Sequence, residues 1–107
     1  MSYQLRVMPR AQVQLCNAAL WWAENRSAKQ AAAWLEGFEA ALSKLAIDPQ
    51  RWPLATESVD VGIEIRQMNY GIGRSKTHRA VFEICDRDVV VHAIRHLAQD
   101  ALHADDF

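Results

Sequence analysis

Three arginines, each in a different part of the C-terminal half, are the side chains best suited to chemistry: Arg66, Arg79 and Arg95. A guanidinium keeps its charge at physiological pH, and its planar donors match two phosphate oxygens at once. His96 directly follows Arg95, and an imidazole titrates near neutral pH and can transfer a proton. Brought together, these four residues would neutralise charge on a phosphate and move a proton.

The segments that carry the arginines show the alternation of apolar and polar residues that is typical of strands. We expect strands at Ile63 to Asn69, Thr77 to Cys85 and Val89 to His96. The turn Tyr70 to Gly73 separates the first two, and Asp86 to Asp88 separates the last two. Each arginine therefore belongs to a different strand.

Alternation also assigns the residues of these strands to a core face or an exposed face. In the first strand Ile63 and Ile65 are expected in the core, which turns Arg66 outward. The same argument places the other two arginines on the exposed face. The residues expected outward are Glu64, Arg66, Met68, Arg79, Glu83 and Arg95, and those expected inward are Ile63, Ile65, Phe82, Ile84 and Ile94.

A structural explanation of the same residues stays open beside the catalytic one. The arginines can form solvated cross-strand ion pairs with Glu64 and Glu83. His96 can equally be a surface histidine at a strand end. A β-bulge that shifts any strand by one residue would also separate the three arginines.

The other cationic residues have weaker assignments. Arg74, Lys76 and His78 form a basic turn that could bind anions or a partner. His92 falls on the inward side of its strand, so we interpret it as a core histidine. His103 indicates no role.

Two amphipathic helices precede these strands and must support them. Tyr3 to Val7 alternates as a short strand, and Pro9 to about Glu24 has apolar residues at helical spacing. Ser27 is typical of a helix N-cap, and the stripe from Ala31 to Leu45 predicts a second helix that ends before Asp48-Pro49. The short connection makes the helices an antiparallel hairpin.

The expected fold is α+β in two layers, in the order β–α–α–β–β–β. The hairpin packs on one face of a mainly antiparallel four-stranded sheet, and residues 1–107 form one domain. Gln50 to Gly62 is expected to be an irregular loop, and Leu97 to Leu102 a short helix. The second sheet face would be partly open, which makes it the expected place of function.

Bulk properties exclude several classes. A formal net charge of -1 gives no general affinity for nucleic acid. Cys16 and Cys85 lack metal-ligand spacing and are expected to be reduced thiols. No signal peptide or membrane span is indicated, so we expect a soluble, cytoplasmic protein. No metal, nucleotide or organic cofactor is indicated.

A series of short motifs, in one order along nearly the whole chain, resembles the RelE/ParE toxins, also called plasmid-stabilisation proteins. The motifs are Pro9-Arg10-Ala11, Trp22, Trp34, Leu42-Ser43-Lys44-Leu45, Asp48-Pro49, Trp52-Pro53, Ile65-Arg66-Gln67-Met68, the turn from Gly73 to Arg79, Val81-Phe82-Glu83-Ile84 and Val91-His92-Ala93-Ile94-Arg95-His96. The resemblance implies a growth-inhibiting toxin of a type II toxin–antitoxin system. It also implies a cognate antitoxin, which would lie in a hydrophobic groove or extend the sheet edge.

The resemblance leaves the target open. RelE-like members cut messenger RNA on the ribosome, whereas ParE-like members inhibit DNA gyrase. A RelE-like site would use Arg66, Arg79, Arg95 and His96, together with lysines before the first arginine and a tyrosine near the C-terminus. Here Leu54 to Glu64 holds no lysine and no tyrosine follows Tyr70. These departures favour the ParE-like function over the nuclease, and an inactive family member is a third alternative.

Partner-binding residues follow from the same interpretation. Trp21 is adjacent to Trp22 but is turned about 100° away on the helix, so it is expected to be an exposed anchor for the antitoxin. Arg74 and Lys76 are the other expected partner contacts.

Overall fold

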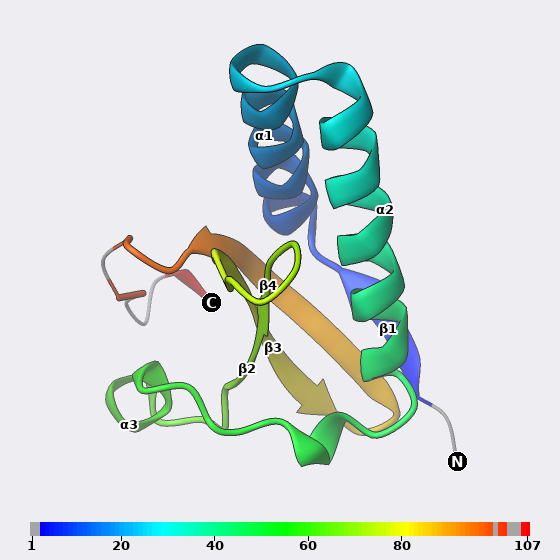
Figure 1. The fold of residues 1–107 in the computed structure, drawn as a ribbon. Coiled ribbons are helices and arrows are strands. Elements are labelled where there is room, and N and C mark those ends of the chain that lie inside the picture. Colours follow the sequence, from blue (N-terminus) through cyan, green and yellow to red (C-terminus); the bar gives the residue numbers. More distant parts are fainter. Residues whose placement is uncertain (1–2, 100, 103–105) are drawn as a thin grey trace.

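The chain folds as a helical hairpin over a four-stranded sheet (Figure 1). The computed structural model describes residues 3–99, 101–102 and 106–107. The elements, in order, are β1 (Gln4–Val7), α1 (Pro9–Asn25), α2 (Ala28–Leu45), the 3-10 turn η1 (Pro49–Arg51), α3 (Glu57–Val61), β2 (Arg66–Tyr70), β3 (His78–Cys85) and β4 (Asp88–His96). The predicted order β–α–α–β–β–β is confirmed, with two short helical segments added between α2 and β2.

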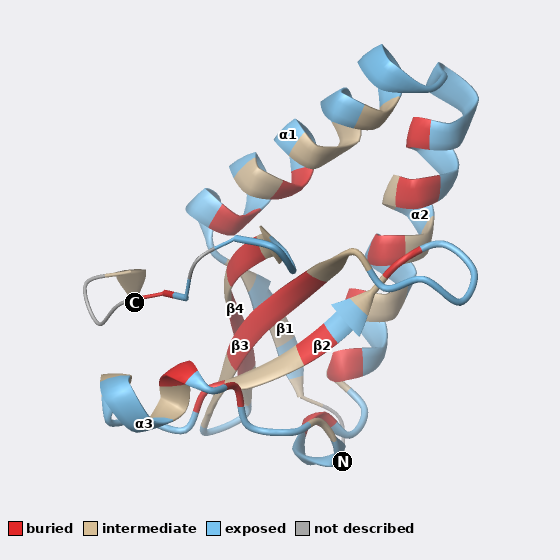
Figure 2. Cartoon of the chain, turned by 60° about the vertical axis from the view of Figure 1, so that its left-hand side comes forward, coloured by how far each residue is buried: buried red, intermediate tan, exposed pale blue. Residues whose placement is uncertain are grey.

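The hairpin begins and ends where the sequence places its signals. Pro9 occupies the first turn of α1, where its missing N–H is not needed. The Ser27 hydroxyl accepts a hydrogen bond of 3.0 Å from the Gln30 N–H, which confirms it as the N-cap of α2. The two helices run antiparallel, and their connected end projects beyond the sheet and is largely exposed (Figures 1 and 2).

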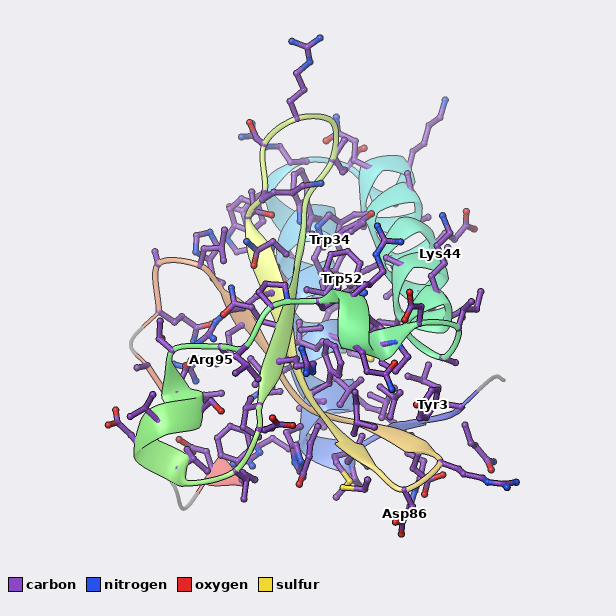
Figure 3. The ribbon with its side chains drawn as sticks, turned by 90° about the horizontal axis from the view of Figure 1, so that it is seen from below. Tyr3, Trp34, Lys44, Trp52, Asp86 and Arg95 are labelled. Carbon is purple, nitrogen blue, oxygen red and sulfur yellow. The ribbon has the colours of Figure 1, made fainter. Side chains whose placement is uncertain are left out.

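The sheet has the strand order β1-β4-β3-β2. The first strand pairs parallel to β4, and the other two pairings are antiparallel, so the predicted α+β fold with a mainly antiparallel sheet is confirmed. Asp86 adopts a left-handed backbone with a φ of 53° at the β3–β4 connection, as hairpin turns require. Its side chain projects from the tip of that hairpin in Figure 3.

Apolar residues are buried on both faces of the sheet, which corrects the expectation of one partly open face. The larger cluster lies between the sheet and the hairpin and includes Trp34, Phe38 and Phe82. The second cluster contains Ala55, Ile65, Val81, Ala93 and Leu102, with Phe107 packed against it. The residues around α3, together with Leu102 and Phe107, therefore cover the face opposite the hairpin.

The predicted orientation of β2 is wrong for this reason. The strand begins at Arg66 rather than Ile63, and Met68, expected outward, is buried beneath the hairpin. Ile65 is buried as expected, but in the second cluster. Because both sheet faces are apolar, alternation alone does not tell which face contacts the helices.

Two further expectations are also corrected. The segment Gln50 to Gly62 is not an irregular loop, because it contains part of η1 and the whole of α3. Leu97 and Ala98 form a turn after β4 rather than the start of a helix, and Asp100 lies outside the described residues. None of the helices in the described part of the chain is long and apolar enough to cross a membrane.

Candidate functional site

Arg79 forms a buried ion pair with Glu57. Arg79 Nη1 donates to Glu57 Oε1 over 3.0 Å, and Arg79 Nη2 contacts the second carboxylate oxygen. Arg79 Nη1 also donates to the side-chain oxygen of Gln67 over 3.2 Å. The expected outward arginine is therefore on the face opposite the hairpin but is covered there, and its partner is Glu57 rather than Glu64 or Glu83.

The Glu57 carboxylate also binds the backbone of a residue near the C-terminus, Leu102. Its Oε2 atom accepts a hydrogen bond from the Leu102 N–H over 3.0 Å, and Oε1 accepts one from the Thr56 hydroxyl. The hydrogen bond from Arg79 is the main cause that lowers the Glu57 pKa from 4.5 to about 2, against the opposing effect of burial. Glu57 is therefore ionised in the folded protein and serves as a structural anchor.

Arg66 lies on the opposite side of the sheet from Arg79, which corrects the expectation of one shared face. Its Cα pairs with that of Phe82, whose side chain packs beneath the hairpin. Arg66 Nη1 donates to the backbone carbonyls of Trp52, over 2.6 Å, and Gln50, over 3.2 Å. This guanidinium fixes the segment after α2 and does not approach the other two arginines.

Arg95 lies on the same sheet face as Arg79, as predicted, because the two Cα atoms are direct partners across β3 and β4. Figure 3 shows its side chain well apart from that of Trp34, which belongs to the hairpin core. Arg95 is partly exposed. The structure thus brings two of the three predicted arginines together on one face.

His96 faces the hairpin side instead, opposite His78. Their Cα atoms are partners across the two strands, and their ring centroids are 5.0 Å apart. The backbone N–H of Ala98 donates to His96 Nδ1 over 3.0 Å. Nδ1 is the acceptor in this bond, so the neutral form of the ring carries its proton on Nε2. His96 and Arg95 follow each other in sequence but serve opposite faces of the sheet.

His78 is half-buried and was expected only as part of a basic turn. Burial, and to a smaller extent the positive charge that His96 carries when protonated, lowers its pKa from 6.5 to about 4. Its ring lies 5.1 Å from that of Trp34, and its Nδ1 atom shares a hydrogen bond of 2.8 Å with the Thr77 hydroxyl. At neutral pH the His78 ring is therefore uncharged and presents an aromatic surface.

These two histidines line a pocket of about 500 Å³ that lies between α1 and the edge of the sheet where β3 begins and β4 ends. Its other lining residues are Ala18, Trp21, Trp22, Arg26 and Thr77. Trp21 is exposed, as predicted, and so are Arg74 and Lys76 in the turn that leads to Thr77. The sequence did not indicate Arg26, because nothing in the helical pattern marks a residue at the hairpin tip as part of a pocket.

His92 does not occupy the hairpin core, which corrects its assignment. A register shift between Val81 and Phe82 opposite it places a bulge in β4. His92 Nε2 contacts Glu83 Oε1 at 3.0 Å, and its ring lies 5.1 Å from Phe107. His103 lies outside the described residues, among which no group of three potential ligands could hold a metal ion.

Three solved structures that are similar to this chain are described as toxins or as toxin–antitoxin systems. A chromosomal ParDE toxin–antitoxin system from P. aeruginosa superposes with a TM-score of 0.72 and 12% identity, covering 89% of this chain and 96% of that one. A mutant of the E. coli toxin RelE in the free state gives 0.58 and 16%, covering 89% and 83%. The RelBE2 toxin–antitoxin complex from Mycobacterium tuberculosis gives 0.54 and 22%, covering 90% and 99%. At these identities the likeness shows the fold.

A match to a family model identifies the family within this class of toxins. The model described as the ParE toxin of the type II toxin–antitoxin system parDE matches residues 5–101. The chain therefore belongs to the ParE toxin family of type II toxin–antitoxin systems. A comparison with curated proteins gives no match.

Proposed function

We propose that this chain inhibits growth by protein–protein contact, with DNA gyrase as its target, and that a cognate antitoxin neutralises it. One observation carries the choice against RNA cleavage. Arg79, the central member of the predicted phosphate-binding set, is held in a buried ion pair with Glu57. A guanidinium that already neutralises a carboxylate is poorly placed to neutralise a phosphate.

Of the remaining nuclease candidates, only Arg95 shares a sheet face with Arg79. Arg66 donates to two backbone carbonyls on the hairpin side of the sheet. His96 faces the hairpin side as well, whereas Arg95 faces the other side. Cleavage requires charge neutralisation and proton transfer at one phosphate. The arrangement supports a binding function better than a catalytic one.

An antitoxin partner is supported by the family and by the exposed hairpin. The similar ParDE and RelBE2 structures are described as toxin–antitoxin assemblies. Here Trp21, in the last turns of α1 before the connection to α2, is 51% exposed. Exposed tryptophans are frequent anchors of protein interfaces.

The proposal is tested by inducing the chain without antitoxin and following DNA supercoiling and messenger RNA in parallel. Gyrase inhibition predicts lost supercoiling activity with intact transcripts, both in cells and with purified gyrase. The Arg95→Ala variant should remain toxic, because this proposal gives Arg95 no catalytic role. Transcript cleavage that disappears in this variant would establish the ribosome-dependent nuclease instead. Absence of any growth defect would identify an inactive family member.

A further inference from the structure

The pocket below α1 is walled by aromatic rings that hold one another in place. The Trp22 ring stacks on Trp34 with centroids 6.4 Å apart and a 28° angle, and Trp21 meets Trp22 edge-on at 5.6 Å. Trp34 in turn contacts His78, and His78 contacts His96. Because Trp34 is fully buried, this series of rings is anchored in the core. The pocket exists before any ligand enters, which reduces the entropy lost on binding.

Several polar groups of the pocket can donate a hydrogen bond, whereas Thr77 Oγ1 and His78 Nδ1 share one with each other. The indole of Trp22 and the two imidazoles form its walls, and Arg26 contributes the formal charge. Since His96 Nδ1 already accepts the Ala98 N–H, its remaining polar group is the Nε2 donor. None of the seven described lining residues carries a carboxylate. The pocket therefore matches a ligand with an apolar body and an adjacent negative charge.

A second hollow of about 300 Å³ continues from the pocket and shares three of its residues. It adds the side-chain amides of Gln14, Asn17 and Gln99. The side-chain oxygens of Gln14 and Gln99 already accept the backbone N–H groups of Ile94 and His96, so these two amides can offer their NH2 groups to peptide carbonyls. An apolar pocket that opens into an amide-lined hollow suits an extended peptide better than a compact small molecule.

We propose that the pocket binds a partner peptide that carries an apolar side chain next to a carboxylate. The apolar side chain enters between Trp21, Trp22 and His78, and the carboxylate accepts from Arg26 and His96. Nucleic acid fits less well, because the lining holds a single arginine and the whole chain has a net charge of -1. This inference takes one point from the proposed function, namely that the chain acts by binding another protein.

The test uses the isolated full chain and a defined probe, the capped peptide Ala-Asp-Phe-Ala. Binding is followed by 1H–15N NMR, in which the indole N–H signals of Trp21 and Trp22 and the amides of Thr77 and His78 should shift. Replacing the peptide aspartate with asparagine should weaken binding by roughly tenfold, because a charged hydrogen bond is lost. Replacing its phenylalanine with alanine should weaken it at least as much.

Matched variants locate the site. Trp21→Ala should weaken binding by about tenfold. Leu20→Ala is the control: Leu20 is 57% exposed on the same helix, but it does not line the pocket, so its replacement should leave binding unchanged. Arg26→Gln should weaken binding and Lys29→Gln, at the same end of the hairpin, should leave it unchanged. Equal effects within either pair would overturn the proposal. So would shifts confined to other surfaces, or a short single-stranded RNA that binds these residues more tightly than the peptide.

This titration does not depend on a growth assay. A chain that binds the peptide but leaves gyrase active would contradict the proposed function alone. A toxic chain whose tryptophan signals do not move would contradict the pocket alone.

Discussion

At the scale of single residues, the carboxylate of Glu57 connects three parts of the chain. It joins α3, which it begins, to Arg79 on β3 and to the backbone of Leu102. Only 2% of Glu57 is exposed. A charge in such a place is tolerated because it is paired and hydrogen-bonded, and removal of either partner leaves the other charge buried without compensation.

We therefore expect Glu57→Gln to lower the free energy of unfolding by about 3–5 kcal/mol at pH 7. The wild-type advantage should also depend on pH. Since the folded pKa of Glu57, about 2, lies below its ordinary value of 4.5, the stabilisation is complete above pH 4.5 and is lost as the pH falls towards 2. Urea unfolding of both proteins from pH 7 to pH 2 should show the difference narrowing across that interval.

The matched control is Glu64→Gln, which removes an exposed carboxylate from the segment before β2. Its effect on the unfolding free energy should stay within about 0.5 kcal/mol. If Glu57→Gln were equally mild, the ion pair would contribute no net stability.

His78 gives a second test at this scale. Its folded pKa of about 4 lies below its ordinary value of 6.5, chiefly because of burial. Protonation therefore favours the unfolded chain, and this residue's contribution to stability should fall as the pH drops from 6.5 towards 4. NMR titration of its ring protons should show a midpoint well below that of the same histidine in urea. A midpoint near 6.5 in the folded protein would show that the ring is solvated.

At the scale of elements, α2 approaches the end of β2 at a glycine. A Cβ atom on Gly37 would overlap the Tyr70 hydroxyl, which donates a hydrogen bond of 3.1 Å to the Trp34 carbonyl. The Tyr70 ring is held by Phe38, 4.4 Å away between centroids. The glycine is thus explained by the close approach of the helix to the tyrosine.

Gly37→Ala should fail to raise the stability of the protein, although alanine usually stabilises a helix more than glycine does. Alanine ordinarily stabilises a helix by about 1 kcal/mol over glycine, but here the overlap with Tyr70 should cancel or exceed that gain. In the Tyr70→Phe background the clashing oxygen is absent and the nearest ring carbon lies 3.3 Å from the added Cβ, so the same substitution should cost less stability than it does beside Tyr70. Thermal unfolding of the four proteins gives the coupling directly. Additive effects would mean that the tyrosine moves aside without cost.

The sequence correctly predicted the elements that pack against a single hydrophobic core, because their apolar residues then follow one simple spacing. Each hairpin helix faces a single core, so apolar residues at helical spacing and the Ser27 cap defined both helices. Strand β2 was assigned the wrong orientation because Met68 packs beneath the hairpin while Ile65 packs on the other face. Helix α3 has only five residues, which is too short for a helical period to be visible.

At the scale of the whole molecule, one sheet separates two unequal cores. The expectation of an open, functional face failed because that face holds Val81, Ala93 and Ile65 and is covered by residues distant in sequence. Glu57 and Arg79 are 22 residues apart, and no local pattern joins them. The arginines on β3 and β4 were correctly placed on one face, yet their surroundings depend on tertiary contacts that alternation does not encode.

The second core should behave as part of the cooperative fold rather than as a loose cover. Leu102 is 4% exposed and packs with the apolar residues of that face, and its N–H donates to Glu57. Leu102→Ala should therefore lower the free energy of unfolding by about 2–4 kcal/mol through lost burial and a remaining cavity. Leu97→Ala, at a residue 40% exposed in the turn after β4, should change it by less than about 0.5 kcal/mol. Denaturant unfolding measures both, and amide exchange at Val81 and Ala93 should accelerate only in the first variant. The contrary result would be faster amide exchange in the C-terminal residues of Leu102→Ala with no change in the unfolding free energy. The C-terminal residues would then detach from the sheet independently of global unfolding, and the sheet face beneath them would be accessible in the folded protein.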